Sequence, residues 1–296
     1  MNAAHKEIFY MNILPIPPLP DVIIEPLVRL ALSEDLGRAG DITTDVTIPA
    51  DTRMIATVNA REPGIAAGYD AARLAARIVD PDLEWEVVHE EGKPFEKGAE
   101  LIRLKGFARS ILTAERMILN FIGPLSGIST LTSKFVDEVK HTNARIVCTR
   151  KTTPGFRALE KRAVRLGGGV NHRLGLDDAI LIKDNHIAAA GSIKAVLERA
   201  KASVGHLCSI EIEVDTLEQL KEAIPFTPTA VLLDNMKPDM LREAVAMING
   251  TCKAEASGGV NLSTVKAIAE SGVDFISVGA LTHSAVNLDV GLDYGD

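Results

Sequence analysis

Six short β-rich runs alternate with amphipathic helical runs through the second half of the chain, and this alternation limits the possible folds most strongly. The residues Lys183, Glu213, Asp234, Ser257 and Gly279, at or next to the ends of five runs, follow one another at intervals of 21 to 30 positions. That interval is typical of a βα unit. The predicted strands cover residues 144–149, 179–183, 209–214, 229–234, 253–257 and 275–279.

Repeated βα units either close into a barrel or form an open, doubly wound sheet. The first predicted strand is not followed by the GxGxxG of a dinucleotide-binding sheet. Polar and charged residues instead occur at the carboxyl ends of several strands, where a (β/α) barrel builds its active site. The sequence therefore predicts an α/β protein with an incomplete barrel of six or seven strands over residues 123–286.

The first third of the chain mixes helical and strand-like runs and is rich in glycine between them. We predict a separate N-terminal α+β sandwich domain over residues 21–122, whose last helix, about 113–122, leads into the barrel. Residues 1–20 end in a proline-rich run and lack a charged start followed by an apolar stretch. They are expected to be a disordered or loosely ordered leader rather than a signal peptide.

Composition excludes several classes of protein. The formal net charge of −8 argues against a general binder of nucleic acid or of membrane surfaces, which requires a basic face. The three cysteines stand far apart, so neither a disulfide framework nor a zinc site is indicated. No apolar run approaches the roughly 20 residues of a membrane span. We expect a cytoplasmic protein.

Residues 149–173 nevertheless hold seven Lys or Arg and a single acid. Arg150 and Lys151 directly follow the first predicted strand, His172 and Arg173 follow a triple glycine, and Lys183 ends the second strand. Cations that converge at one barrel mouth suit a ligand with carboxylates or phosphates. For any single basic residue a surface ion pair is the simpler interpretation, but the three clusters together favour a site.

The helix predicted after Pro154 carries the remaining basic residues of this stretch. Arg157, Lys161 and Arg165 are spaced at i, i+4 and i+8, so they share one helix face. We expect that face to be solvated or to contact another subunit rather than to bind substrate.

Acidic residues also occur at the strand ends. Strict alternation in the third strand puts Glu211 and Glu213 on the face that points into the barrel, and Asp234 ends the next strand. Buried carboxylates require a cation, a basic partner or hydroxyl donors. Glu213 and Asp234 are therefore candidates for binding magnesium or sugar hydroxyls, and ion pairs with Lys183 or Arg150 are an equally good interpretation.

The glycine-rich turns after the last two strands, 257–259 and Gly279, are typical of backbone phosphate sites in barrels. Either turn alone could be an ordinary βα turn, but together they favour phosphate. The residues thus predict a site for a sugar phosphate and a polyanionic partner.

Seven motifs in the chain resemble those of one enzyme family in order and spacing. They are TAERMILN, TRKTTPGFR, GGGVNHRLGLDDAILIKDNHI, EIEVD, LLDNM, EASGGV and ISVGALTHS. The family is that of the quinolinate phosphoribosyltransferases, or carboxylating nicotinate-nucleotide pyrophosphorylases. The resemblance covers nearly the whole chain, from EDLGRAGDITTD to the end.

The resemblance implies a pentosyltransferase of de novo NAD biosynthesis. Members of the family join quinolinate to phosphoribosyl pyrophosphate with Mg²⁺, and release nicotinate mononucleotide, pyrophosphate and CO₂. It implies a homodimer with active sites shared between subunits, and a hexamer as a larger assembly. It also implies that residues 287–296 return to the N-terminal domain.

Roles in quinolinate binding follow from the matching motifs. The resemblance implies that Arg150, His172 and Arg173 hold the carboxylates of quinolinate. Arg116, in TAERMILN, would join them from the neighbouring subunit. Lys151 would contact a substrate carboxylate, a phosphate or the pyrophosphate.

Roles toward the phosphoribosyl group are implied in the same way. Lys183 would contact the phosphate or pyrophosphate groups, while Glu213 and Asp234 would face the ribose hydroxyls and Mg²⁺, directly or indirectly. The expected catalytic residues are Lys151, Lys183, Glu213 and Asp234. Those expected to cradle the 5′-phosphate are Ser257, Gly258, Gly259 and Gly279.

Two alternatives remain open from the sequence. One is a paralogue of the same fold, related to molybdenum uptake, with another substrate. The other is a non-catalytic sensor that binds quinolinate or a phosphosugar, and the acid pair Glu213 and Asp234 argues against it.

Overall fold

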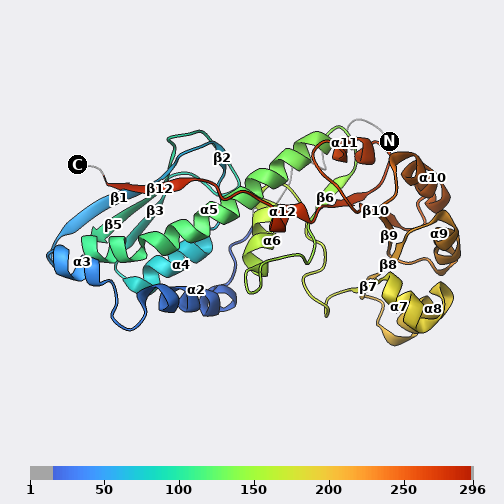
Figure 1. Cartoon of the computed structure of the whole chain (residues 1–296), viewed down its shortest axis with the longest axis horizontal. Helices are drawn as coiled ribbons and strands as arrows, with labels where there is room; N and C mark the ends of the chain where they lie inside the picture. Colours follow the sequence, from blue (N-terminus) through green and yellow to red (C-terminus); the bar gives the residue numbers. More distant parts are fainter. Residues whose placement is uncertain (1–15, 295–296) are drawn as a thin grey trace. The chain divides into compact units, whose positions relative to one another are not determined.

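The computed structural model describes residues 16–294, which form two compact units (Figure 1). One unit comprises the described residues up to Gly123 together with those from Asp289 onward, and the other comprises Pro124–Leu288. Most of the leader expected over residues 1–20 lies outside the described residues. No helix of the described part is long and apolar enough to cross a membrane.

The first unit is built on a four-stranded antiparallel sheet of order β12-β1-β5-β3. Along β1, every second residue is buried, namely Ala56, Val58 and Ala60, as expected for a strand with one face on a core. A separate pair joins β2 (Gly64–Ile65) to β4 (Pro94–Phe95). The sheet strands are β1 (Arg53–Ala60), β3 (Glu84–Val87), β5 (Glu100–Phe107) and β12 (Val290–Tyr294).

Helices complete this unit. Ile24, Val28 and Leu32 recur at every fourth position of α2 and form its buried stripe. Helices α2 and α4 contact each other. The helices are α2 (Asp21–Leu36), α3 (Ile42–Thr47), α4 (Tyr69–Val79) and the start of α5 (Ala108–Val139).

Helix α5 corrects one prediction. The helix expected at about 113–122 begins at Ala108 and continues through Pro124 to Val139. A proline inside a helix removes one backbone hydrogen bond and usually ends or kinks it. Here the apolar residues beyond it, including Leu125, Ile128 and Phe135, are buried, so their packing offsets the loss.

The second unit is an incomplete (β/α) barrel. Its six strands are all parallel, in the order β6-β11-β10-β9-β8-β7, and the sheet stays open between β6 and β7. A seventh position is marked only by an isolated bridge from Val147 to Val170. The strands are β6 (Arg145–Val147), β7 (Ile180–Ile182), β8 (Ile210–Val214), β9 (Ala230–Asp234), β10 (Lys253–Ser257) and β11 (Phe275–Ser277). All six predicted strands are confirmed.

Helices follow the strands and lie on the outer side of the sheet (Figure 1). Ile210, Ile212 and Val214 are buried, while Glu211 and Glu213 occupy the alternate positions. The helices are α6 (Arg157–Leu166), α7 (Asp184–Ala190), α8 (Ile193–Ser203), α9 (Leu217–Ala223), η1 (Ile224–Phe226), α10 (Pro238–Ile248), α11 (Val265–Ala269) and α12 (Ala280–His283).

Helix α6 overturns the expectation of a solvated basic face. Lys161 is 2% exposed, and its Nζ donates to the His172 carbonyl oxygen at 2.9 Å. Arg157 is half-buried and donates to Thr152 Oγ1, so only Arg165 of the three is exposed. Residue spacing correctly predicts that the three basic residues share one face of α6. It does not predict that other loops of the barrel cover most of that face.

Candidate active site

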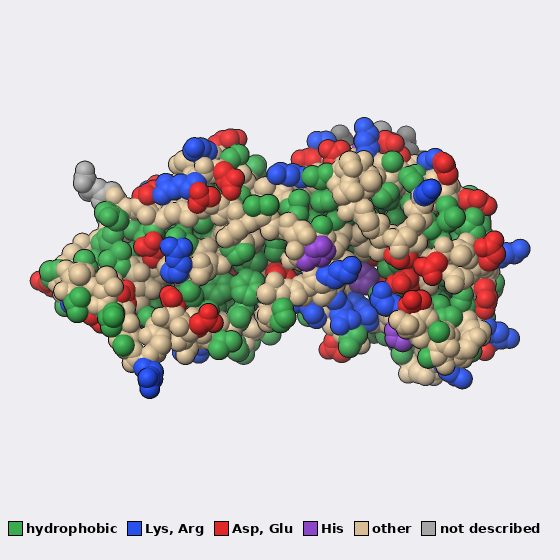
Figure 2. All heavy atoms as spheres, viewed as in Figure 1, with side chains coloured by type: hydrophobic (Ala, Val, Ile, Leu, Met, Phe, Trp, Pro, Cys, Tyr) green, Lys and Arg blue, Asp and Glu red, His purple; other side chains and the backbone are tan. Residues whose placement is uncertain are grey.

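The carboxyl ends of the parallel strands bring the predicted residues of the barrel to one edge of the sheet. Arg150 and Lys151 come three and four residues after the end of β6, and Lys183 directly follows β7. Glu213, Asp234 and Ser257 lie within the last two residues of β8, β9 and β10. On the face of the barrel unit shown in Figure 2, Lys and Arg side chains gather beside histidines and next to acidic side chains.

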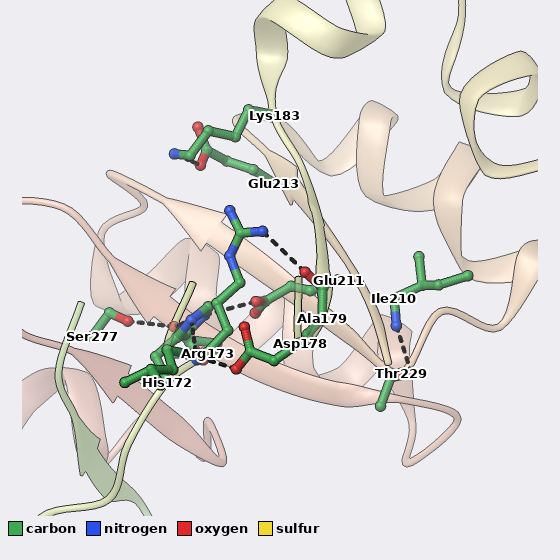
Figure 3. Close-up of polar contacts among 12 residues, drawn as sticks. His172, Arg173, Asp178, Ala179, Lys183, Ile210, Glu211, Glu213, Thr229 and Ser277 are labelled. Carbon is green, nitrogen blue, oxygen red and sulfur yellow. Dashed lines mark hydrogen bonds and ion pairs between the residues drawn. The ribbon is translucent and has the colours of Figure 1, made fainter. Parts of the chain in front are cut away.

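Two of the arginines lie close together. Burial, followed by the charge of Arg150, lowers the pKa of the Arg173 guanidinium. The Nε atoms of both residues are buried and have no hydrogen-bond partner among residues 16–294. Arg173 uses one terminal nitrogen to donate to the Ala179 carbonyl oxygen at 3.0 Å (Figure 3). Neighbouring guanidiniums with unused donors form a binding site for a multivalent anion.

Lys183 and Glu213 form an ion pair, with Nζ 2.6 Å from Oε2 (Figure 3). The Glu213 side chain is 12% exposed and that of Lys183 is 47% exposed, so the lysine reaches solvent while the carboxylate lies deeper. The ion-pair interpretation for Glu213 is therefore confirmed. It is compatible with ligand binding, because the described contacts of Glu213 involve one carboxylate oxygen only.

The turns after β9 and β10 meet at Gly258. Register places Asp234 beside Ser257, and the Asn235 N–H donates to the Ser257 carbonyl oxygen at 2.9 Å. Gly258 has a φ of +92°, and a Cβ there would lie 2.1 Å from Asn235 Oδ1. Only glycine fits this turn. Its neighbour Gly259, with a φ of +60°, has open space around it.

Gly279 and Lys151 lie side by side after β11 and β6. A Cβ on Gly279 would be 3.3 Å from Lys151 Cδ, and Thr282 Oγ1 donates to the Lys151 carbonyl oxygen at 2.7 Å. The exposed Lys151 side chain is thereby placed beside the glycine turn that was predicted to bind phosphate.

A buried polar group lies on the inner face of the sheet. His172 Nε2 is 2.8 Å from Glu211 Oε2 and 3.6 Å from Glu255 Oε1, and Ser277 Oγ donates to Glu255 (Figure 3). Burial, followed by the charge of Glu211, raises the pKa of Glu255 to about 7. Burial lowers the pKa of His172, but hydrogen bonding to Glu211 and the two carboxylate charges leave it above its ordinary value.

The ligand atoms of His172, Glu211 and Glu255 lie within 4.8 Å of one another, as they would around a metal ion. The other ring nitrogen argues against that use. His172 Nδ1 accepts from the Arg173 N–H at 2.9 Å, so the proton of the neutral ring is on Nε2, facing the carboxylates. Hydrogen bonds therefore account for this group without a metal.

Sequence reasoning missed Glu255 and Ser277. Both are buried and support His172. The alternation in KAEAS puts Glu255 on the same face as Ser257, so this signal was available. Arg116, the predicted residue outside the barrel, is exposed on α5 in the first unit.

Comparison with known sequences agrees with this geometry. The family models for the N-terminal and C-terminal domains of quinolinate phosphoribosyl transferase match residues 41–126 and 128–293. The chain belongs to the quinolinate phosphoribosyl transferase family. The predicted family and the predicted fold are both confirmed.

Individual members of the family are similar over most of the chain. A nicotinate-nucleotide pyrophosphorylase [carboxylating] of Mycobacterium leprae is 45% identical over 90% of this chain and 95% of its own. A quinolinate phosphoribosyltransferase [decarboxylating] of Nicotiana tabacum is 41% identical over 93% of this chain and 83% of its own. The solved nicotinate-nucleotide pyrophosphorylase of Francisella tularensis superposes with a TM-score of 0.90 at 39% identity, covering 96% of this chain and 100% of its own.

Proposed function

We propose that the protein transfers the phosphoribosyl group of phosphoribosyl pyrophosphate to quinolinate, with loss of CO₂, to give nicotinate mononucleotide and pyrophosphate for NAD biosynthesis. One observation carries the proposal beyond family membership. Burial, followed by the charge of Arg150, lowers the pKa of Arg173, and the buried Nε of each arginine has no hydrogen-bond partner among the described residues. Quinolinate is a rigid dicarboxylate, so its two carboxylates can relieve this repulsion and take up these donors.

We assign the quinolinate pocket to Arg150, Arg173 and Lys151, with Arg116 supplied by a neighbouring subunit. His172 lies next to the same pocket, because its Nδ1 accepts a hydrogen bond from the Arg173 backbone N–H. Since both of its ring nitrogens are already engaged, its contribution to binding is to orient Arg173.

The phosphoribosyl group is assigned to the glycine turns after β10 and β11, the second of which lies beside Lys151. The turns at Ser257, Gly258, Gly259 and Gly279 offer backbone N–H groups to the 5′-phosphate. The ammonium groups of Lys183 and Lys151 would contact the pyrophosphate.

Glu213 and Asp234 fit the magnesium ion that the family uses. Both offer carboxylate oxygens, the donors that Mg²⁺ prefers. In the described contacts each uses one oxygen only, Glu213 with Lys183 and Asp234 with Asn235. Bound Mg²⁺ would neutralise charge on the departing pyrophosphate.

The chain's own residues can stabilise the charge that develops during transfer. Loss of pyrophosphate leaves positive charge at the anomeric carbon, and the carboxylates of Glu213 and Asp234 stabilise it, while Lys183 stabilises the leaving group. No covalent nucleophile is required. After transfer, the bond between C2 of the ring and its carboxylate breaks and CO₂ leaves. The electron pair stays on C2, where the positive charge of the adjacent pyridinium nitrogen stabilises it, and C2 then takes a proton from water. Arg150 and Arg173 hold the ring in place during that step.

We infer a cytoplasmic homodimer with shared sites, and a hexamer as a larger assembly of such dimers. Two observations support this inference: the acidic net charge suits neither nucleic acid nor membrane surfaces, and Arg116 is exposed on α5.

The proposal is tested by incubating the purified protein with quinolinate, phosphoribosyl pyrophosphate and Mg²⁺, and with each component omitted in turn. We expect nicotinate mononucleotide only in the complete mixture. Nicotinate in place of quinolinate should give little product, because it lacks the second carboxylate. Binding of quinolinate without turnover would support a sensor instead, and neither binding nor turnover would support a paralogue with another substrate.

A further inference from the structure

Helix α6 lies between the two loops that carry the quinolinate-binding arginines. The first loop, residues 148–153, holds Arg150, and the second, residues 171–179, holds Arg173. Neither loop has a regular run of helix or strand that would fix it through backbone ladders. The position of both guanidiniums must therefore depend on side-chain contacts.

Lys161 holds the second loop through a hydrogen bond to its backbone. Its buried Nζ donates to the His172 carbonyl oxygen at 2.9 Å and to Cys148 Sγ at 3.1 Å. Cys148 in turn donates to Asn171 Oδ1 at 3.4 Å. Taking an ammonium group out of water is unfavourable, so a buried lysine requires strong hydrogen bonds such as these to offset its burial.

The neighbouring residue on α6 anchors the first loop. Glu160 is 3% exposed, and its carboxylate oxygens accept from the Thr153 N–H at 3.3 and 3.2 Å. Burial raises the pKa of Glu160 above its ordinary value.

One turn earlier, Arg157 reaches both loops. Its Nε donates to Thr152 Oγ1 at 2.8 Å in the first loop, and a terminal nitrogen donates to the Leu174 carbonyl oxygen at 3.1 Å in the second. Arg157, Glu160 and Lys161 thus join the two loops through one short helix.

We propose that Arg157, Glu160 and Lys161 of α6 are positioning residues for quinolinate, which set the spacing between Arg150 and Arg173. None of the three needs to touch substrate, because all act through the loop backbone or Thr152. The inference rests on the proposed function, since it concerns the affinity for one of the two proposed substrates. It predicts that damage to α6 weakens quinolinate binding selectively, because the residues assigned to phosphoribosyl pyrophosphate lie mainly on other loops.

The test compares the same substitution at three positions of α6. In Lys161→Met we expect the KM for quinolinate to rise at least about tenfold, as for the loss of a charged hydrogen bond. In Arg157→Met we expect a rise of about three- to tenfold, since Arg157 is only half-buried. Arg165→Met, at the exposed position, should change the KM for quinolinate by less than about twofold. The KM for phosphoribosyl pyrophosphate should stay within about twofold in all three.

Two further measurements separate positioning from general destabilisation. Lys161→Gln retains a donor and should recover part of the lost quinolinate affinity; it also serves if Lys161→Met does not fold. Calorimetric titration with quinolinate alone should show the same order of affinities without turnover. Hydrogen exchange should be faster at residues 171–178 in Lys161→Met than in Arg165→Met.

Equal increases of both KM values, or a quinolinate KM as little changed in Lys161→Met and Arg157→Met as in Arg165→Met, would overturn the inference. Wild-type protein in the same assay keeps this result distinct from failure of the proposed function. If the wild type does not turn over quinolinate, the proposed function is wrong. If it does and the three variants behave alike, only the role of α6 is wrong.

Discussion

Arg173 is the single residue on which the quinolinate pocket depends most directly. It is half-buried, its Nε has no hydrogen-bond partner within residues 16–294, and its backbone N–H donates to His172 Nδ1. In Arg173→Lys we expect the KM for quinolinate to rise by about 10- to 100-fold, because a lysine cannot replace a bidentate guanidinium. Steady-state kinetics with each substrate varied will measure this. A similar rise in the KM for phosphoribosyl pyrophosphate would contradict the assignment of Arg173 to quinolinate.

The raised pKa of Glu255 predicts how the stability of the fold depends on pH. Its pKa in the folded protein is raised from 4.5 to about 7, so between those values the folded state keeps a proton that the unfolded state has lost. This group therefore contributes stability at low pH that is lost as the pH rises toward 7. Glu255→Gln removes that contribution, and the Tm advantage of the wild type should shrink by about 2–6 °C from pH 5 to pH 8. Thermal unfolding at both pH values checks it; a wild-type advantage that grows with pH would refute it.

Single residues also mark where prediction from sequence stops. Glu211 and Glu213 could be placed by alternation alone, because a strand fixes which way each side chain points. Lys161 could not, because helix spacing shows which residues share a face but not which loop later covers that face. Lys161 donates to the backbone carbonyl oxygen of residue 172. Every residue has a backbone carbonyl, so the amino-acid sequence does not show which one accepts this hydrogen bond.

At the scale of elements, the packing of α5 against the turn after α6 depends on Gly167. A Cβ there would lie 2.3 Å from the Ser129 carbonyl oxygen and 2.7 Å from Thr132 Cβ. In Gly167→Ala we expect a loss of about 1–3 kcal/mol of unfolding free energy, or about 3–10 °C in Tm. Gly205→Ala is the matched control, since nothing lies within 4 Å of its Cβ. Equal Tm values for the two variants would show that this contact is not close in solution.

Elements differ in how well the sequence predicts them. The barrel strands were predictable because they are short runs between helical repeats, and several of them, such as 209–214 and 229–234, contain β-branched residues. The length of α5 was not, because local rules stop a helix at Pro124 and only the burial of Leu125 and Ile128 shows why it continues.

At the scale of the whole molecule, the proposed sharing of sites predicts complementation between inactive chains. Arg116→Ala and Arg173→Ala should each lose most activity alone. The mixture of the two should regain about a quarter of wild-type activity, because random exchange makes about half of the dimers mixed and each mixed dimer has one of its two sites intact. Activity after subunit exchange, with exchange followed by mass spectrometry, measures this. Proven exchange without recovery would place Arg116 outside a shared site.

The central claim is that this basic barrel mouth joins a dicarboxylate to a phosphoribosyl group and then releases one carboxylate. Its most direct test uses quinolinate labelled in the carboxylate at C2, next to the ring nitrogen. The account predicts one labelled CO₂ for each nicotinate mononucleotide formed, and no release unless phosphoribosyl pyrophosphate is present. Label retained in the product, or CO₂ released without phosphoribosyl pyrophosphate, would contradict it.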